Sequence, residues 1–126
     1  MKELNYPSKE TINKLTKDLK LEGADEFTQD WEYEVANVNQ LAEYIEYYQS
    51  RSLNINEKTT LMRIILEAYN DYVVLENKED VYSEIIKEFL NSDYSIYEET
   101  IKYWACEGKE LEDCFALTPF IRNIKV

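Results

Sequence analysis

Two pairs of acidic residues have a spacing that could serve chemistry. Glu43 and Glu46 are three positions apart, and Glu67 and Asp71 are four positions apart. On helices, these spacings place the members of each pair on one face. Four carboxylates that converge between two helices could hold Mg²⁺, because this ion prefers oxygen ligands. The question is then whether the chain has the other parts of such a site.

The two pairs resemble the ExxE and ExxD motifs of the all-α nucleotide pyrophosphatases, and this resemblance implies a Mg²⁺-dependent enzyme. The second pair departs from the motif by one residue. In addition, no Lys or Arg is spaced to hold phosphates beside either pair. A pyrophosphatase-like enzyme is therefore kept as the third of three hypotheses for the function.

Other catalytic arrangements lack essential residues. The chain has no histidine, so the usual base for a Ser or Cys nucleophile is missing, and it has no glycine-rich phosphate loop. Cys106 and Cys114 are flanked by Glu107 and Asp113, which disfavour the thiolate form. Two cysteines without a histidine cannot complete a usual zinc site. We therefore predict reduced thiols, no metal, no cofactor and no enzymatic activity.

The charge of the chain is strongly acidic and unevenly distributed. Its 126 residues include 26 acids and 14 bases, which give a formal net charge of −12. This balance argues against direct binding of nucleic acid or of anionic membranes. No base lies between Lys20 and Arg51, although this stretch is rich in acids. Beside the simpler explanation that the acids aid solubility, the distribution favours a basic protein as the partner.

Tyrosines accompany these acids, and the chain has 11 of them. Tyrosine supplies a large contact area at a low cost in conformational entropy, and it is enriched at protein interfaces. The alternative is that most of the tyrosines lie between the core and the surface of a helical bundle. We predict a partner-binding face made of Asp30, Glu32, Tyr33, Glu34, Glu43, Tyr44, Glu46, Tyr47 and Tyr48.

The elements that carry these residues are predicted to be helical throughout. Apolar residues recur at helical spacing, and the chain contains only 2 glycines and 2 prolines. We therefore predict an all-α fold, with residues 1–126 forming a single-domain antiparallel bundle of five to six helices. No apolar run has the length of a signal peptide or a membrane span, which predicts a cytoplasmic protein.

Three helices are expected in the first part of the chain. Ser8 is the expected N-cap of the first, which should end near Gly23. The second is expected over residues 30–49, and Asn56 is expected to cap the third, over about residues 57–76. The second should be buried along Trp31, Val35, Val38, Ala42 and Ile45. The third has a wide apolar face formed by Leu61, Met62, Ile65, Leu66, Ala68, Tyr69, Tyr72 and Val73.

The remaining helices are expected after Asn77. The fourth should bury Val81, Ile85, Ile86, Phe89 and Leu90. Ser95 and Glu98 have the spacing of a capping box that starts a fifth helix, which should end at Gly108. Thr118 is expected as the N-cap of a short last helix, with Pro119 as its first residue. Arg122 is expected to pair with Glu112 or Asp113.

Residues 61–126 also contain a distinctive order of residues: Tyr103-Trp104, then Glu112-Asp113, Phe115 and Thr118-Pro119. This pattern resembles the small, acidic, helical immunity proteins of bacterial polymorphic toxin systems. The resemblance implies a cytoplasmic, non-enzymatic protein that binds and neutralises a cognate toxin, for which an acidic face is suitable if the toxin is basic. These families diverge widely, so no binding residue is carried over. The alternative is an all-α adaptor or regulatory module with another basic partner.

Overall fold

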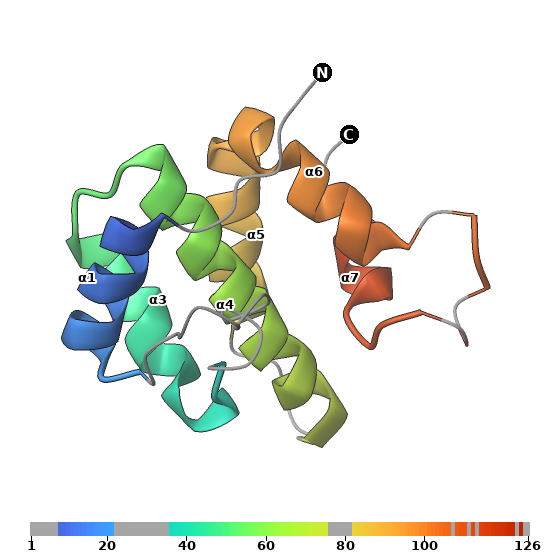
Figure 1. Ribbon diagram of the computed structural model, residues 1–126. Helices are drawn as coiled ribbons and strands as arrows, with labels where there is room; N and C mark the ends of the chain where they lie inside the picture. The colour runs from blue at the N-terminus through green and yellow to red at the C-terminus, as the bar shows by residue number, and fades with distance from the viewer. Residues whose placement is uncertain are drawn as a thin grey trace. The chain divides into compact units, whose positions relative to one another are not determined.

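The computed structural model describes residues 8–21, 36–75, 82–106, 108–110, 112, 114–122 and 124. Its regular elements are six α-helices and one 3-10 turn, so the predicted all-α class is confirmed (Figure 1). The chain forms two compact units, Met1–Ala68 and Tyr69–Val126. The antiparallel arrangement and the single domain stay predictions.

Helix α1 (Lys9–Leu19) has the predicted start. The Ser8 hydroxyl accepts a hydrogen bond from the Thr11 N–H at 3.1 Å and so satisfies one of the free donors of the first turn. The helix ends earlier than predicted, because Lys20 adopts the left-handed conformation and closes the last turn. The expected end at Gly23 lies outside the described residues.

The helix predicted over residues 30–49 is interrupted within its described part. Asn37 is extended, and its side chain accepts a hydrogen bond from the Asn39 N–H at 2.9 Å. Such local bonds compete with helix formation. A 3-10 turn, η1 (Val38–Gln40), follows, and only then does helix α3 (Leu41–Ser50) begin. The prediction of one continuous helix is therefore wrong.

The buried face of α3 also differs from the predicted one. Ala42 is exposed and Val38 is half-buried, whereas Trp31 and Val35 lie outside the described residues. The predicted buried stripe assumes a helix that is continuous through Asn37. Because α3 begins only after this residue, the set of side chains that it buries differs from the predicted one. The side chains that α3 buries are Leu41, Tyr44, Ile45 and Tyr47.

Helix α4 (Ile55–Leu75) starts with a capping box at Asn54. The Asn54 side chain accepts a hydrogen bond from the Glu57 N–H at 2.8 Å, and the Glu57 carboxylate accepts one from the Asn54 N–H at 3.0 Å. The predicted cap, Asn56, has another partner, because its side-chain oxygen accepts a hydrogen bond from the Ser8 N–H at 2.9 Å. Asn56 therefore ties the start of α1 to the start of α4.

The wide apolar face predicted for α4 is confirmed along most of the helix. It ends sooner than predicted, because Tyr72 is half-buried and both Val73 and Val74 are exposed. None of the helices formed by the described residues is long and apolar enough to cross a membrane. The side chains buried along α4 include Leu61, Met62, Ile64, Ile65, Leu66, Ala68 and Tyr69.

In the second unit, helix α5 (Ser83–Ser92) is followed almost directly by helix α6 (Tyr94–Ala105). Helix α5 buries Ile86, Phe89 and Leu90, as predicted, whereas Ile85 is only half-buried and Val81 lies outside the described residues. Since α6 begins at Tyr94, Ser95 lies inside the helix, and the predicted capping box at this residue is wrong. The side chains that α6 buries are Tyr97, Thr100, Ile101, Trp104 and Ala105.

The short helix α7 (Thr118–Arg122) begins one residue away from the predicted position. The Leu117 carbonyl accepts the hydrogen bond from the Ile121 N–H at 2.9 Å, so Thr118 is already inside the helix. Its hydroxyl accepts a hydrogen bond from the Phe115 N–H and donates one to the Trp104 carbonyl at 2.9 Å. Thr118 therefore joins the start of α7 to the end of α6.

Candidate functional site

The predicted binding face is described only in part. Asp30, Glu32, Tyr33 and Glu34 lie outside the described residues, and the other five predicted residues are on α3. Two are exposed acids, Glu43 and Glu46. The three tyrosines differ, because Tyr48 is half-buried, whereas Tyr44 and Tyr47 are buried, with exposed fractions of 0% and 5%.

Tyr44 stabilises the start of α3 from inside the core. Its hydroxyl accepts a hydrogen bond from the Asn37 N–H at 3.1 Å, next to the break that precedes the helix. Burial raises the pKa of Tyr44, the hydrogen bond from Asn37 lowers it, and the charge of Glu43 raises it. The ring and the hydroxyl are thus both occupied within the first unit.

Tyr47 belongs to a three-residue cluster with Asp18 and Arg51. Its hydroxyl donates a hydrogen bond of 2.7 Å to the Asp18 carboxylate. The Arg51 guanidinium lies over the Tyr47 ring, 4.9 Å from its centroid, and 3.8 Å from the same carboxylate. The prediction that Tyr44 and Tyr47 offer their rings to a partner is therefore corrected, since both rings are part of the core.

We expect Tyr47 to make the protein sensitive to alkaline pH. Burial is the main cause that raises the pKa of its hydroxyl, and the hydrogen bond to Asp18 raises it further. A raised pKa in the folded state means that the stabilisation is complete below pH about 10, where tyrosine titrates in the unfolded chain. It is lost as the pH rises toward the folded-state value.

The measurement is thermal unfolding between pH 8 and 11 for the parent and the Tyr47→Phe variant. At pH 8 the variant should be less stable by about 0.5–1.5 kcal/mol, the usual value of a hydrogen bond. Above pH 10 the parent should lose stability more steeply, so that the two curves converge. Curves that stay parallel would contradict the assigned role of this hydroxyl.

The carboxylates of Glu43 and Glu46 remain available on α3. Neither forms a salt bridge with another described residue. Two other acids of the first unit are paired, since Glu57 lies 3.3 Å from the Lys14 ammonium and Asp18 lies 3.8 Å from the Arg51 guanidinium. The exposed part of the predicted face is therefore an acidic surface with little aromatic area.

The four-carboxylate metal site considered above is not formed. Within the described part of the chain, no three Asp, Glu or Cys side chains come together as potential metal ligands. This holds for Glu43 and Glu46 on α3 and for Glu67 and Asp71 on α4, all of which are described.

A disulfide bond joins Cys106 and Cys114, so the prediction of reduced thiols is wrong. The bond closes the connection between α6 and α7 across a sequence separation of 8. Two cysteines without a recognisable pattern did not indicate this pairing. It arises because Cys106 adopts the left-handed conformation, with φ of 55°, and turns the chain at the end of α6.

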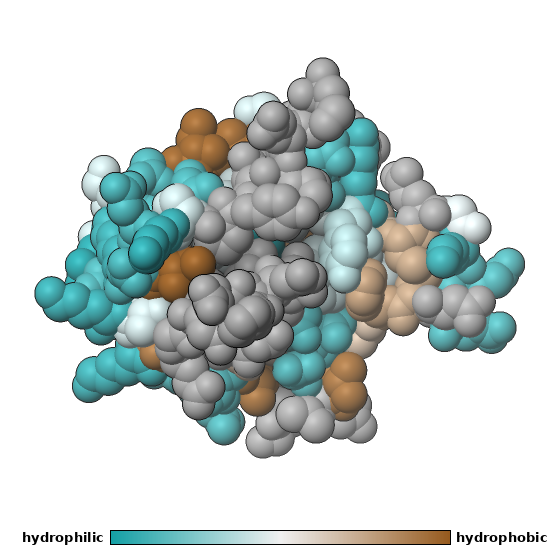
Figure 2. Space-filling model, in the orientation of Figure 1, coloured by the Kyte–Doolittle hydropathy of each residue, from teal (hydrophilic) through white to brown (hydrophobic). Residues whose placement is uncertain are grey.

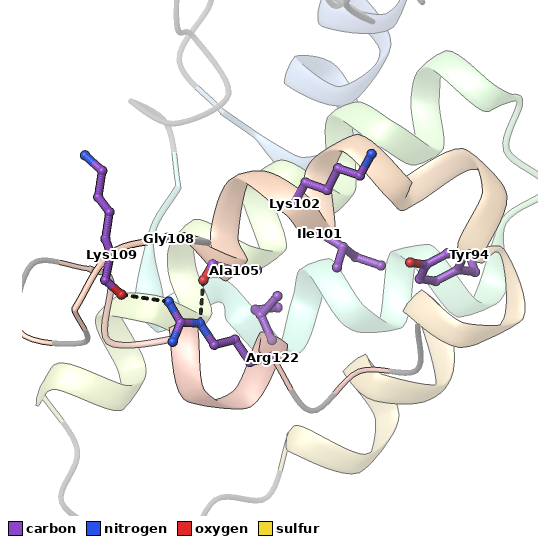
Figure 3. A pocket seen from close by; sticks show the side chains of 8 residues that line it. Tyr94, Ile101, Lys102, Ala105, Gly108, Lys109 and Arg122 are labelled. Carbon is purple, nitrogen blue, oxygen red and sulfur yellow. Dashed lines mark hydrogen bonds between the residues drawn. The ribbon is translucent and has the colours of Figure 1, made fainter.

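Arg122 holds the base of the same loop. Its guanidinium donates to the carbonyls of Ala105 and Cys106, each at 2.8 Å, and to that of Lys109 at 3.1 Å (Figure 3). These carbonyls lie at and beyond the end of α6, where a basic side chain is favourable. Arg122 thus donates to three carbonyl groups, whereas the sequence predicts that it pairs with Glu112 or Asp113.

A pocket of about 450 Å³ lies beside Arg122 in the second unit. Its apolar lining comes from Ile101, Ala105 and Ile121. Figure 3 shows the ammonium groups of Lys102 and Lys109 directed away from one another, with the guanidinium committed to carbonyls. The pocket therefore lacks the converging polar groups that usually mark a ligand site.

An exposed aromatic side chain is present on α6, whereas the sequence predicts exposed tyrosines on α3. Tyr103 is 54% exposed. Its ring centroid lies 5.3 Å from that of Phe115 and 5.5 Å from that of the buried Trp104. Figure 2 shows apolar side chains around the end of α6 and α7, bordered by hydrophilic ones. Tyr103 is not among the residues that the sequence predicts for the binding face.

The chain was compared with known protein families, with curated protein sequences and with solved structures, and nothing matched.

Proposed function

We propose that this protein binds a basic protein partner and neutralises it, as an immunity protein does with a cognate toxin. The observation that supports this proposal is the pair of exposed acids on α3, Glu43 and Glu46, which form no salt bridge with other described residues. They lie in the long part of the sequence that contains no base, in a chain with a net charge of −12.

Such a surface acts mainly on the rate of association. Unpaired carboxylates create a negative potential that steers a basic partner toward them and raises the association rate, most strongly at low salt. The protein acts by occupying the partner's surface, and no reaction is required of it. The proposal includes the predicted cytoplasmic location, where the Cys106–Cys114 bond is exposed to cellular reductants.

The test is a measurement of binding kinetics against the product of the adjacent reading frame. The double variant Glu43→Lys, Glu46→Lys reverses the charge of the α3 surface. We expect it to associate about tenfold more slowly and to show a weaker dependence on salt. Reversal of exposed charges changes steering without opening a cavity, so the fold should remain intact.

A matched control separates steering by this surface from the effect of net charge. Glu84 and Glu88 are also exposed, on α5, and their replacement by Lys makes the same change in net charge. The control should associate nearly as fast as the parent. If both double variants slow association equally, the α3 surface has no special role. If the parent does not bind at all, the proposed toxin partner is wrong.

A further inference from the structure

One arginine of this chain already lies against a tyrosine ring and beside a carboxylate. In the first unit, Arg51 lies 4.9 Å from the centroid of the Tyr47 ring and 3.8 Å from the Asp18 carboxylate, which also accepts the Tyr47 hydroxyl proton at 2.7 Å. A ring face and an adjacent carboxylate together match the two properties of arginine, its planar delocalised charge and its hydrogen-bond donors.

The surface around Tyr103 has the same two kinds of group. Tyr103 is a tyrosine at 54% exposure, and Glu99, four positions earlier on α6, is also exposed. Residues four apart on a helix are neighbours on its surface. Glu99 forms no salt bridge with another described residue, whereas the nearby Lys102 lies 3.9 Å from Glu98. A carboxylate and an exposed ring therefore share one face of α6.

The Tyr103 ring is held in place by the aromatic side chains that pack against it. Phe115 packs against Tyr103 at 5.3 Å and against Trp104 at 4.5 Å, and Trp104 is buried. Phe115 follows Cys114 directly, and its N–H donates to the Thr118 hydroxyl at 3.1 Å, so its position is fixed by the disulfide and by α7. A ring that is fixed before binding loses less entropy when a partner docks on it.

The described charges of α6, the loop and α7 are slightly acidic in balance. They are four acids, Glu98, Glu99, Glu110 and Glu112, and three bases, Lys102, Lys109 and Arg122, of which Lys102 lies 3.9 Å from Glu98 and Arg122 donates to backbone carbonyls. Two of these acids, Glu110 and Glu112, are described on the loop that the disulfide closes, and both are exposed. A cationic group is therefore the occupant whose charge complements this face.

We infer that the Tyr103 surface, defined by Glu99, Tyr103 and Phe115, binds an arginine side chain of the basic partner. The guanidinium stacks on the Tyr103 ring, as the Arg51 guanidinium does on the Tyr47 ring, and donates to the Glu99 carboxylate. This inference rests on the proposed function, since it names the kind of residue that the partner presents. Arginine is favoured over lysine because only its planar group combines stacking with paired donors.

The experiment is an NMR titration of the full chain with a capped tetra-arginine peptide, with a tetra-lysine peptide as the second probe. Resonances of Tyr103 and Glu99 should shift, and the arginine peptide should bind about 2–5-fold more tightly, as expected for an exposed cation–π contact. In the Tyr103→Leu variant the shift of the Glu99 resonances should disappear. The control Tyr94→Leu, at the start of α6, should leave it unchanged.

The outcomes separate this inference from the proposed function. Shifts confined to Glu43 and Glu46 would overturn the arginine site and leave the acidic α3 surface as the binding face. Equal affinity for the two peptides, or shifts that persist in Tyr103→Leu, would also overturn it. If no resonance shifts with either peptide, both the arginine site and the proposed binding of basic partners fail.

Discussion

Replacement of Leu66 by alanine is expected to lower the free energy of unfolding by about 2–5 kcal/mol. Leu66 is fully buried on α4 among other large apolar side chains. Truncation removes the favourable transfer of its side chain from water and leaves a cavity that closely packed neighbours fill only in part. Urea unfolding followed by circular dichroism would measure the change.

The control for this prediction lies on the same helix. Val74 is 63% exposed, so Val74→Ala removes apolar atoms that are already in water. We expect it to change the free energy of unfolding by no more than about 0.5 kcal/mol. If both variants lose the same stability, the difference in burial along α4 does not determine the energetics, and the assignment of Leu66 to the core is wrong.

The contrast between Leu66 and Val74 also shows which parts of the fold could be predicted. The apolar pattern from Leu61 to Tyr69 is continuous over several turns, and a pattern of that length predicts a buried helix regardless of its neighbours. It does not predict the end of burial, because that depends on where packed neighbours are present. Val73 continues the pattern in the sequence and is nevertheless exposed.

The ends of the helices were predicted less well than their buried faces, because each end depends on a few local hydrogen bonds. Asn54 and Asn56 are both suitable caps by residue type. The decision between them comes from Glu57, which completes a capping box with Asn54 only. Asn37 is extended and accepts a hydrogen bond from the Asn39 N–H, so α3 begins only at Leu41, and Ile45 is the one described member of the predicted stripe that is buried.

For the candidate site, composition drew attention to the tyrosines and could not show which of them are exposed. A tyrosine has both apolar and polar atoms, so its type does not decide between core and surface. Tyr44 and Tyr47 face the core because α3 buries that side, while Tyr103 is exposed because the adjacent Trp104 is the side chain that α6 buries. Whether a tyrosine is buried depends on which face of its helix packs against the core, and the sequence pattern does not determine that face.

The second large effect is expected at the disulfide. Reduction of the Cys106–Cys114 bond should lower the free energy of unfolding by about 2–3 kcal/mol. The bond joins residues 8 positions apart, and it removes the corresponding loop-closure entropy from the unfolded chain. A reductant such as TCEP tests this directly, with mass spectrometry to establish that the bond is broken.

The reduced protein should remain folded, because the two ends of the loop are also held by hydrogen bonds. Arg122 binds the carbonyls of Ala105 and Cys106, and Thr118 binds the Trp104 carbonyl. In the double variant Cys106→Ser, Cys114→Ser, the midpoint of unfolding should equal that of the reduced parent and should not respond to TCEP. If the oxidised and reduced parent unfold at the same denaturant concentration, the hydrogen bonds alone hold the loop in both states. The covalent bond would then contribute nothing to stability.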